Sequence, residues 1–284
     1  MHPLGKVALA SFAFGVVPPI LLLLVRSLAW VQNVHVLGQI LGLCCTLFIL
    51  LSLPQGFLDE EIDQVSRRAG FLGAVFGSCP LIAILYPCFT PFAWYLGALS
   101  FFHFSEYLVT SIIRPNRLGL DSFLLDHSPA YKAAAVASWL EFFMEIYLFP
   151  ELKSLNCVTW VGLGLCLVGE LLRKGAMLTA GFHFDHLIRY EKEEGHQLIT
   201  HGIYAYFRHP AYVGWFYWAI ATQLILINPI CLLAYIWASW MFFNARIFEE
   251  ECTLLNFFGE EYIQYQNRVP TGLPFIKGYQ YGKT

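Results

Sequence analysis

Charged side chains are scarce in this sequence. Asp, Glu, Lys and Arg make up 13% of its 284 residues, whereas a soluble globular domain carries about 25%. The hydrophobic share is 57%, the aromatic share is 17% and the mean hydropathy is +0.57. These values exclude a soluble domain, and several apolar runs approach the roughly 20 residues that span a bilayer.

The chain also lacks a basic block and any cysteine or histidine spacing typical of a metal site. Its formal net charge is −3, so we expect no nucleic-acid partner. Eight cysteines are present, but no CxxC pair occurs, and neither a disulfide framework nor a bound metal is predicted. The cysteines within apolar runs are expected to be small buried hydrophobic residues: Cys44, Cys45, Cys79, Cys166 and Cys231.

Eight apolar runs predict an all-α integral membrane protein with about eight transmembrane helices. The polar segments 59–68 and 181–209 are predicted to be loops, and 257–268 is predicted to be an amphipathic helix at the membrane surface. No small-residue cleavage site follows the first run, which predicts a retained span rather than a signal peptide. The expected spans cover about 7–25, 34–53, 70–86, 91–112, 132–149, 157–180, 210–227 and 230–247.

The distribution of Lys and Arg over the predicted loops indicates the orientation. With eight spans both termini lie on one side, and 15 of the 17 Lys and Arg residues fall on that side. Arg26 and Lys153 are the two on the opposite side. Because cytoplasmic loops carry the excess of Lys and Arg, we expect both termini and the 181–209 loop to face the cytosol.

One polar stretch, HQLITHGIYAYFRHPAYVG at 196–214, directly precedes an apolar run. Pro is favoured at the first position of a helix, so Pro210 is predicted to begin a membrane helix that His209 caps. The free amides and the positive dipole end of such a helix start bind anions. Arg208 is expected beside this anion site, with Tyr204 and Tyr212 supplying hydroxyls. Arg, His and aromatic residues also gather at membrane interfaces as anchors, and this alternative stays open.

Ionisable groups inside predicted spans are costly and therefore are functional candidates. Glu170 lies one helical turn from Arg173 and Lys174 and can pair with them. Arg246 has glutamates at i+3 and i+4, which makes helix-end ion pairing the alternative to a functional role. For Glu141, Glu145, His103 and Glu106 we favour structural or tunnel polarity over direct catalysis.

The pattern Gly202-x-Tyr204, Arg208-His209-Pro210-x-Tyr212-x-Gly214 and the later acidic cluster 249–251 resembles the C-terminal signature of the isoprenylcysteine carboxyl methyltransferases. Membrane phospholipid methyltransferases and sterol reductases carry similar RHPxYxG segments. The segments FHFSEYLVTS, LDSFLLDHSPAY, SWLEF, RHPAYVGWFYW, FFGEEYIQY and RVPTGLPFIKG, in this order, resemble the animal-type carboxyl methyltransferases over about 70–278.

This resemblance implies an endoplasmic-reticulum enzyme that uses S-adenosylmethionine and releases S-adenosylhomocysteine. Its substrates would be Ras-like and other CaaX proteins, methylated on the carboxylate of the prenylated C-terminal cysteine within membrane lipid. Family members hold a neutral amide where this chain has Arg189. The residues implied for the cofactor are Arg189, His196, Gln197, Leu198, Ile199, Tyr204, His209, Pro210, Ala211, Tyr212 and Glu250.

The implied reaction needs no general base, because a C-terminal carboxylate is already ionised at pH 7. We predict Arg246 as the clamp for the substrate carboxylate and Arg173 as the second choice, since a guanidinium can donate two N–H groups to one carboxylate. Trp215 begins an aromatic run that would line a slot for the prenyl chain or form a lipid-facing belt. We expect one polytopic domain over 1–284, with N-terminal spans in 1–112 and a catalytic core over 132–284 whose cofactor site lies within 181–260.

Three other functions compete with this one. A phospholipid N-methyltransferase would share the setting and the cofactor, but its amine nucleophile must lose a proton. A sterol reductase would use NADPH and need cations for the 2′-phosphate. A prenyl-lipid-binding scaffold or a transporter would explain the charges in the spans without chemistry, but not the polar cluster at one helix start. No sequence feature sets an oligomeric state.

Overall fold

A computed structural model describes residues 1–27, 59–126, 128–192 and 195–279. All regular secondary structure within these residues is helical, which confirms the all-α class for this part of the chain. The chain forms two compact units, one made of residues 1–163 and 224–228 and the other of residues 164–223 and 229–284. The span expected at 34–53 lies outside the described residues.

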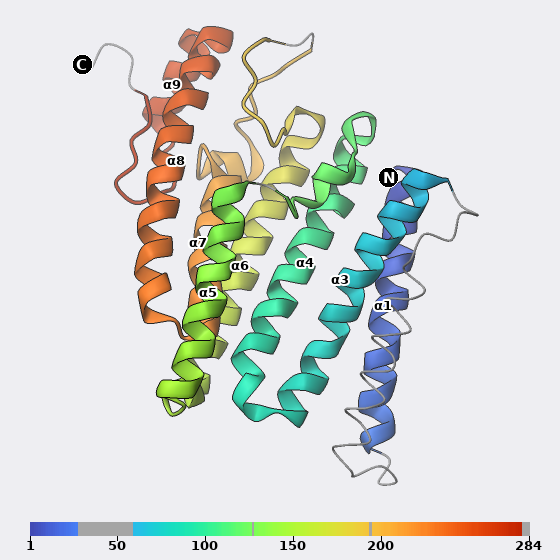
Figure 1. The fold of residues 1–284 in the computed structure, drawn as a ribbon. Coiled ribbons are helices and arrows are strands. Elements are labelled where there is room, and N and C mark those ends of the chain that lie inside the picture. The colour runs from blue at the N-terminus through green and yellow to red at the C-terminus, as the bar shows by residue number, and fades with distance from the viewer. Residues whose placement is uncertain (28–58, 127, 193–194, 280–284) are drawn as a thin grey trace. The chain divides into compact units, whose positions relative to one another are not determined.

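In the first unit, the three long helices α1 (Pro3–Ser27), α3 (Glu60–Leu85) and α4 (Thr90–Ile113) lie side by side (Figure 1). Pro18 and Pro19 lie inside α1, which is one continuous helix. The helices of this unit are α1 (Pro3–Ser27), α3 (Glu60–Leu85), α4 (Thr90–Ile113), α5 (Pro129–Leu148) and the start of α6 (Asn156–Ala180), with the short turns η1 (Pro87–Phe89), η2 (Pro115–Arg117), η3 (Leu120–Phe123) and η4 (Leu152–Ser154).

The prediction that 59–68 is a polar loop was wrong, because α3 already begins at Glu60. The Asp59 carboxylate accepts a hydrogen bond from the Glu61 amide at 3.0 Å and caps the helix. An ion pair between Arg67 and Asp63, 3.0 Å apart, supports the first turns at i,i+4 spacing. The hydropathy pattern missed this extension because its exposed residues are charged.

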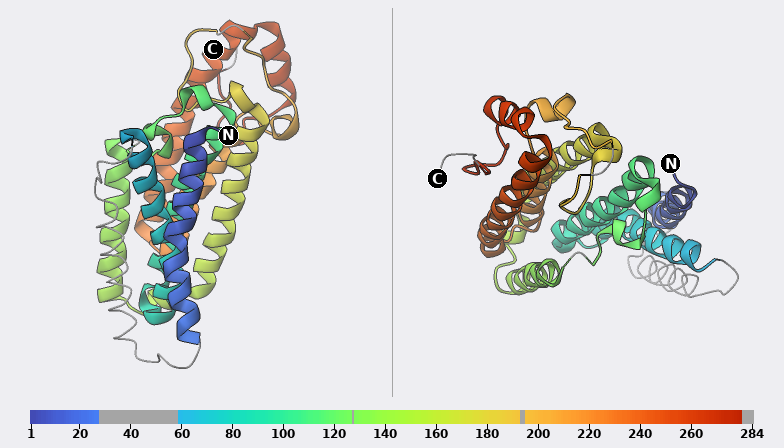
Figure 2. Two further views of the ribbon diagram at one scale, coloured as in Figure 1. Left: turned by 90° about the vertical axis from the view of Figure 1, so that its right-hand side faces the viewer. Right: turned by 90° about the horizontal axis from the view of Figure 1, so that it is seen from above.

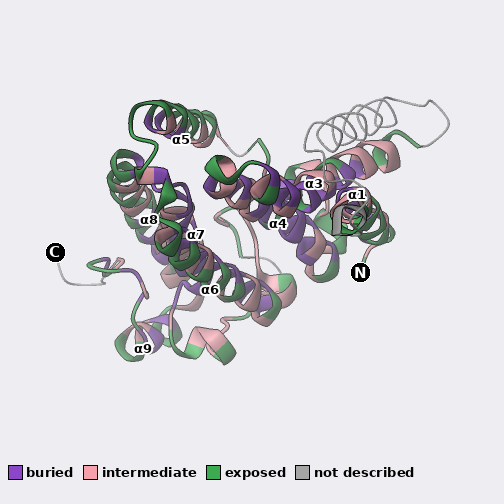
Figure 3. Ribbon diagram, turned by 90° about the horizontal axis from the view of Figure 1, so that it is seen from below, coloured by how far each residue is buried: buried purple, intermediate pink, exposed green. Residues whose placement is uncertain are grey.

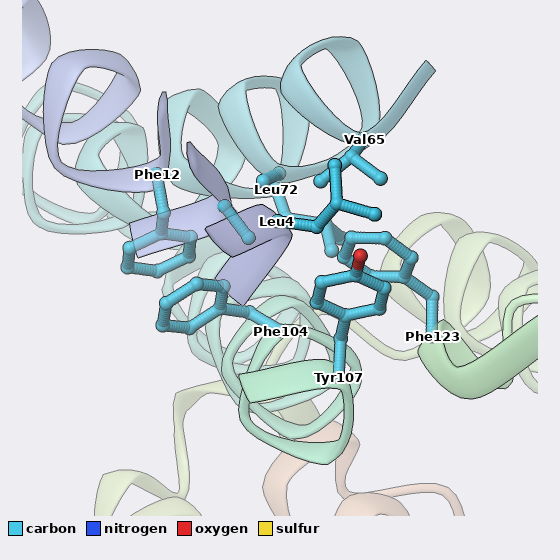
Figure 4. Close-up of a cluster of buried hydrophobic side chains, with 9 residues drawn as sticks. Leu4, Phe12, Val65, Leu72, Phe104, Tyr107 and Phe123 are labelled. Atoms are coloured by element: carbon cyan, nitrogen blue, oxygen red, sulfur yellow. The ribbon is translucent and has the colours of Figure 1, made fainter. Parts of the chain in front are cut away.

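The core of the first unit is aromatic (Figure 4). Phe12 of α1 stacks on Phe104 of α4 with ring centroids 3.8 Å apart, and Tyr107 stacks on Phe123 at 4.0 Å. Glycines allow α1 and α3 to pack closely, since a Cβ on Gly77 would lie 2.7 Å from the Val16 carbonyl oxygen. Small residues at a crossing are how membrane helices approach each other.

The second unit contains the rest of α6 and the helices around the 196–214 stretch (Figure 2). Its elements are η5 (Gly181–His183), η6 (Gly202–Ala205), α7 (Pro210–Leu226) up to residue 223, α8 (Pro229–Phe258) and α9 (Glu260–Arg268). The expected helix start at Pro210 is confirmed. The helix α8 continues beyond the expected end of the last span at 247, to Phe258, where Gly259 turns the chain with φ +53°.

The helices α6 and α7 cross at a pair of glycines. A Cβ on Gly214 would lie 2.5 Å from the Gly169 carbonyl oxygen and 2.7 Å from the Arg173 amide nitrogen. A Cβ on Gly169 would lie 2.7 Å from the Gly214 carbonyl oxygen. The glycine of the RHPxYxG motif therefore serves close backbone packing, and this packing brings Arg173 beside the first turns of α7.

Four of the described helices are long and apolar enough to cross a membrane, namely α1, α3, the segment formed by η1 and α4, and α8. Large apolar side chains are exposed along α8, among them Leu233 and Trp237. Much of the α8 ribbon is accordingly coloured as exposed in Figure 3. Three of the cysteines predicted as buried hydrophobic residues, Cys79, Cys166 and Cys231, are buried and unbridged. Cys44 and Cys45 lie outside the described residues.

Candidate functional site

A cavity in the second unit opens at the start of α7. Its walls come from the end of α6, from residues 183–189 and 196–199, from η6 and from the first turn of α7. The last turns of α8 and the helix α9 complete them. The family resemblance implied eleven residues for the cofactor, and all eleven line this one cavity: Arg189, His196, Gln197, Leu198, Ile199, Tyr204, His209, Pro210, Ala211, Tyr212 and Glu250.

The first turn of α7 presents its amide end to the cavity. The His209 carbonyl oxygen accepts hydrogen bonds from the amides of Tyr212 and Val213, each at 3.0 Å, so His209 immediately precedes the helix. The Ala211 amide heads the helix at the cavity wall, where a helix has no intrahelical acceptor for its first N–H groups. The wall therefore carries the positive end of a helix dipole.

A chain of three polar side chains borders the same wall. Tyr212 donates its hydroxyl hydrogen to Glu250 Oε2 and accepts a hydrogen bond from Arg246 Nε at 2.9 Å. Arg246 Nη2 donates to the His186 carbonyl oxygen at 2.6 Å. Within the described residues, Glu250 Oε1 and Arg246 Nη1 have no hydrogen-bond partner, and Arg246 forms no ion pair with either nearby glutamate.

The other residues predicted to handle the substrate lie just behind the cavity wall. The Arg173 guanidinium is buried, lies over the Trp215 ring at 4.7 Å from its centroid, and is 3.5 Å from the Ala211 carbonyl oxygen through Nη1. Arg246, Arg173 and Trp215 do not themselves line the cavity. Arg246 instead contacts Tyr212 and Arg173 contacts Ala211, both of which are residues of the wall, whereas Trp215 lies one turn further along α7.

Residues 183–192 and 195–199 bring rings and cations to the border of the cavity. His196 makes edge contacts with the rings of Phe257 and Phe258, at centroid distances of 5.8 and 5.3 Å. Lys192 lies over the Phe258 ring at 4.7 Å and donates to the Phe257 carbonyl oxygen at 2.8 Å. Arg189 Nε lies 3.4 Å from an Asp185 carboxylate oxygen, so its charge is paired at the wall.

Two tyrosines outside the candidate spans stay protonated at neutral pH. Burial, aided by the negative charge of Glu250, raises the pKa of Tyr204 above its ordinary value near 10. The hydrogen bond from Tyr190 to Glu249, 2.5 Å long, raises the pKa of Tyr190. Both phenols are therefore hydrogen-bond donors rather than anions at the cavity and its loop.

A buried network centred on Glu251 was not expected from the sequence. Glu251 Oε1 accepts hydrogen bonds from Arg208 Nε at 2.9 Å, His209 Nε2 at 3.0 Å and Tyr262 at 3.1 Å, while Oε2 accepts one from Gln266 at 3.1 Å. Burial and Glu251 raise the pKa of Tyr262 well above its usual range. The glutamate is fully buried and holds together the start of α7, α8 and α9.

Arg208 lines the cavity, as its expected place beside the helix start requires. The network adds that its side chain is committed to protein groups. Beyond Glu251, Arg208 donates to the carbonyl oxygens of Gln266, Val269 and Lys277. The signal in the sequence was the run of three glutamates at 249–251, from which spacing alone does not tell which one faces Arg208.

Polar groups elsewhere have partners of their own. Lys174 pairs with Glu170 at 3.2 Å, which confirms local pairing in α6. Glu145 pairs with Lys153 at 2.6 Å in the first unit. His103 contacts the Phe123 carbonyl oxygen at 2.8 Å and the Tyr131 hydroxyl at 3.0 Å, while Glu106 and Glu141 are buried.

The comparisons with known proteins point to one family. Residues 160–256 match the isoprenylcysteine carboxyl methyltransferase family model. The chain is 47% identical to protein-S-isoprenylcysteine O-methyltransferase of Xenopus laevis, covering 96% of this chain and 95% of that one. It is 44% identical to the protein of that name from Tribolium castaneum, covering 99% of both. A solved structure of the eukaryotic intramembrane Ras methyltransferase matches with TM-score 0.90 and 43% identity, over 99% of this chain and 100% of that one.

Proposed function

The chain belongs to the isoprenylcysteine carboxyl methyltransferase family, and on that premise we propose that the cavity at the start of α7 binds S-adenosylmethionine. The reaction is the methylation of the C-terminal carboxylate of a prenylated cysteine and releases S-adenosylhomocysteine. The observation that supports this site is the convergence of eleven residues from separate segments on one cavity. Some of these residues are far apart in the sequence, and the fold brings them to the same cavity.

The residues of the wall fit the chemistry of this cofactor. Its adenine is planar, and the cavity offers the rings of Phe257 and Phe258 together with the 196–199 backbone. Its carboxylate fits the amide end of α7, where the Ala211 N–H heads the helix. Its ammonium and sulfonium charges fit the Glu250 carboxylate, one oxygen of which takes no hydrogen bond from the described residues. When bound, the cofactor supplies a methyl group made electrophilic by its sulfonium.

The chain's own residues must align the reacting atoms and exclude water. A C-terminal carboxylate with a pKa near 3.5 is ionised at pH 7, so no side chain has to remove a proton. Alignment of a nucleophile with its target contributes several kcal/mol to such a step. The raised pKa keeps the Tyr204 phenol neutral, so it does not repel the substrate carboxylate, and the Tyr212 hydroxyl donates to Glu250.

Arg246 is our candidate for orienting the substrate carboxylate. Its Nε and Nη2 are held by the Tyr212 hydroxyl and the His186 carbonyl, which fixes the plane of the guanidinium. Its Nη1 hydrogens are then available to a carboxylate that enters beside Tyr212. Arg173 is the second candidate, because it reaches the Ala211 carbonyl from behind the wall. Trp215, under Arg173, is the proposed start of the prenyl slot.

The membrane setting completes the proposal. The chain is a membrane protein, and we propose eight spans with both termini and the cavity facing the cytosol, in the endoplasmic reticulum membrane. The 15 to 2 distribution of Lys and Arg supports this orientation. The proposed acceptors are Ras-like and other CaaX proteins, whose prenyl chain reaches the site from the lipid.

One assay tests the proposed function. Purified protein in phospholipid vesicles is given methyl-labelled S-adenosylmethionine with a farnesylcysteine analogue, with phosphatidylethanolamine, or with no acceptor. We expect base-labile label on the farnesylcysteine analogue alone, because a methyl ester hydrolyses in base. Base-stable label on phosphatidylethanolamine would instead make the chain a phospholipid N-methyltransferase, and binding of the analogue without label would make it a scaffold.

A further inference from the structure

The segment that follows α9, residues 269–279, is here called the C-terminal strap. Its first part runs beside the start of α7, where the amides of Arg208 and His209 donate to the carbonyl oxygens of Pro270 at 2.9 Å and Thr271 at 3.3 Å. The Arg208 side chain also donates to the carbonyl oxygen of Lys277 at 3.0 Å. Because Arg208 forms hydrogen bonds with both ends of the strap, the residues between these ends form a loop that closes at Arg208.

The middle of the strap lies against the apolar part of α8. Leu273 and Ile276 are buried in one cluster with Phe243 and Ile247 of α8. The Trp240 indole N–H donates to the Pro274 carbonyl oxygen at 2.9 Å. Trp240 precedes Arg246 by six residues, which is about 9 Å along a helix. The strap therefore returns from the polar end of α8 to a level where α8 is a candidate membrane span.

Phe275 projects from the turn between these two buried residues. It is 94% exposed, whereas Leu273 and Ile276 are 5% and 4% exposed. Its backbone has φ +63°, a left-handed conformation that bulky residues rarely adopt and that often marks a functional constraint. The chain thus holds an aromatic ring outward although the ring adds nothing to the core.

An exposed face of α8 is apolar as well, and one of its residues, Phe248, contacts the Tyr279 ring of the strap at a centroid distance of 5.3 Å. Trp237, Met241 and Phe248 are 68%, 49% and 52% exposed, and their spacing of four and seven residues places them on one face of the helix. Large contiguous apolar patches are rare on surfaces that face water. Since this stretch of α8 is itself long and apolar enough to cross a membrane, lipid is the medium that matches both features.

We propose that Phe275 inserts into the acyl-chain layer of the leaflet next to the cofactor cavity and anchors the strap there. Through Arg208 the anchored strap is tied to the Glu251 network, and thus to the helix start that lines the cavity. The lipid contact concerns a surface outside the cavity, so it holds or fails independently of the methyl-transfer assignment. The coupling to the cavity is the part that rests on the proposed function.

Photocrosslinking tests the lipid contact directly. Full-length protein with p-benzoylphenylalanine at position 275 is reconstituted into phosphatidylcholine vesicles and irradiated, and the adducts are identified by mass spectrometry. The matched control carries the probe at Tyr206, an aromatic residue that is 72% exposed in the polar segment before α7. We expect phosphatidylcholine adducts at 275 at roughly ten times the yield at 206. Equal yields, or crosslinks at 275 to a second copy of the chain, overturn the proposal.

A pair of substitutions tests the coupling to the cavity. Glycine adopts positive φ freely, so Phe275→Gly relieves the backbone restriction and should leave the thermal midpoint in detergent unchanged or raised. In vesicles we expect this variant to bind S-adenosylmethionine several-fold more weakly, while Phe275→Trp binds as the parent does. A Phe275→Gly variant with unaltered cofactor affinity in vesicles overturns the coupling, whether or not the lipid adduct forms.

Discussion

Two cations in this molecule, Lys153 in the first unit and Arg246 in the second, differ in how their N–H donors are used. The Lys153 ammonium is buried and has more acceptors than hydrogens, all of them protein groups. These acceptors are Glu145 Oε2 at 2.6 Å, the carbonyl oxygens of Leu226 and Ile227 at 2.9 Å each, and Asn228 Oδ1 at 3.0 Å.

Arg246 is held only in part. Its Nε and Nη2 contact Tyr212 and His186, and its Nη1 has no acceptor among the described residues. Glu250, at the other end of the Tyr212 hydroxyl, likewise has one oxygen that accepts no hydrogen bond there. A saturated network such as that of Lys153 is typical of a structural role, whereas the partly satisfied network of Arg246 and Glu250 keeps hydrogen-bonding capacity beside the proposed cofactor cavity.

The largest effect is expected when the saturated network is broken. Lys153→Met leaves the Glu145 carboxylate without its cation in the interior, which should lower the free energy of unfolding by about 3–5 kcal/mol. Tryptophan fluorescence during thermal unfolding in vesicles measures the loss. The fraction that remains folded should keep its cofactor affinity, because Lys153 has no contact with the cavity.

The double variant Lys153→Met with Glu145→Gln is the control for that experiment. Removing both charges should restore part of the stability, since no unpaired carboxylate remains buried. A single variant as stable as the parent chain would show that the lysine network does not support the hairpin between α7 and α8. A saturated network would then not be evidence of a structural role in this protein.

Arg246→Lys addresses the open network. A lysine ammonium cannot hold Tyr212 and His186 and still present two donors to a carboxylate in one plane. We expect turnover to fall about a hundredfold, equivalent to about 2.7 kcal/mol of transition-state stabilisation, with cofactor affinity nearly unchanged. Arg268→Lys, at an exposed position of α9, is the matched control and should leave both unchanged. Full activity of the Arg246→Lys variant would show that Arg246 does not orient the substrate carboxylate.

Glu250→Gln sharpens the distinction among three consecutive glutamates. Loss of its charge should weaken S-adenosylmethionine binding about tenfold, roughly 1.4 kcal/mol, and affect the prenylcysteine analogue less. Glu249→Gln is the control, because Glu249 contacts the exposed Tyr190 rather than the cavity. Calorimetric titration in detergent gives both affinities. A larger loss for the prenyl substrate would reassign Glu250 to the acceptor side.

These three glutamates also show where sequence alone stops. The helix start at Pro210 follows from a local rule, and resemblance to the family assigned the residues around it. Successive positions on a helix differ by about 100°, so Glu249, Glu250 and Glu251 face the loop, the cavity and the interior in turn. Which of the three faces the cavity depends on how α8 packs against its neighbours, and the local sequence does not specify that packing. Sequence therefore located the cluster but not the separate role of Glu251.

Other differences from expectation have the same origin. The first turns of α3 carry charges that obscure a helix in a hydropathy pattern, although the cap at Asp59 was a local signal. The C-terminal strap has no periodicity, and its course depends on carbonyls that bond to Arg208 from more than 60 residues away. Lys153 was counted as a loop charge, yet it is buried with partners from two segments that are distant in the sequence, α5 and residues 226–228.

The smallest expected effect comes from Tyr262, which donates to Glu251 and has a raised pKa. A folded pKa above the unfolded value near 10 gives stability that is complete below pH 10 and falls as the pH rises above it, by up to about 1.4 kcal/mol per pH unit for one proton. At pH 7, Tyr262→Phe should cost about 1 kcal/mol, the net worth of its hydrogen bond. Above pH 10 its unfolding midpoint should fall less steeply than that of the parent chain, so the two curves converge. Parallel curves measured in vesicles from pH 7 to 11 would mean that the Glu251 network tolerates an ionised phenol and is less closed than its contacts indicate.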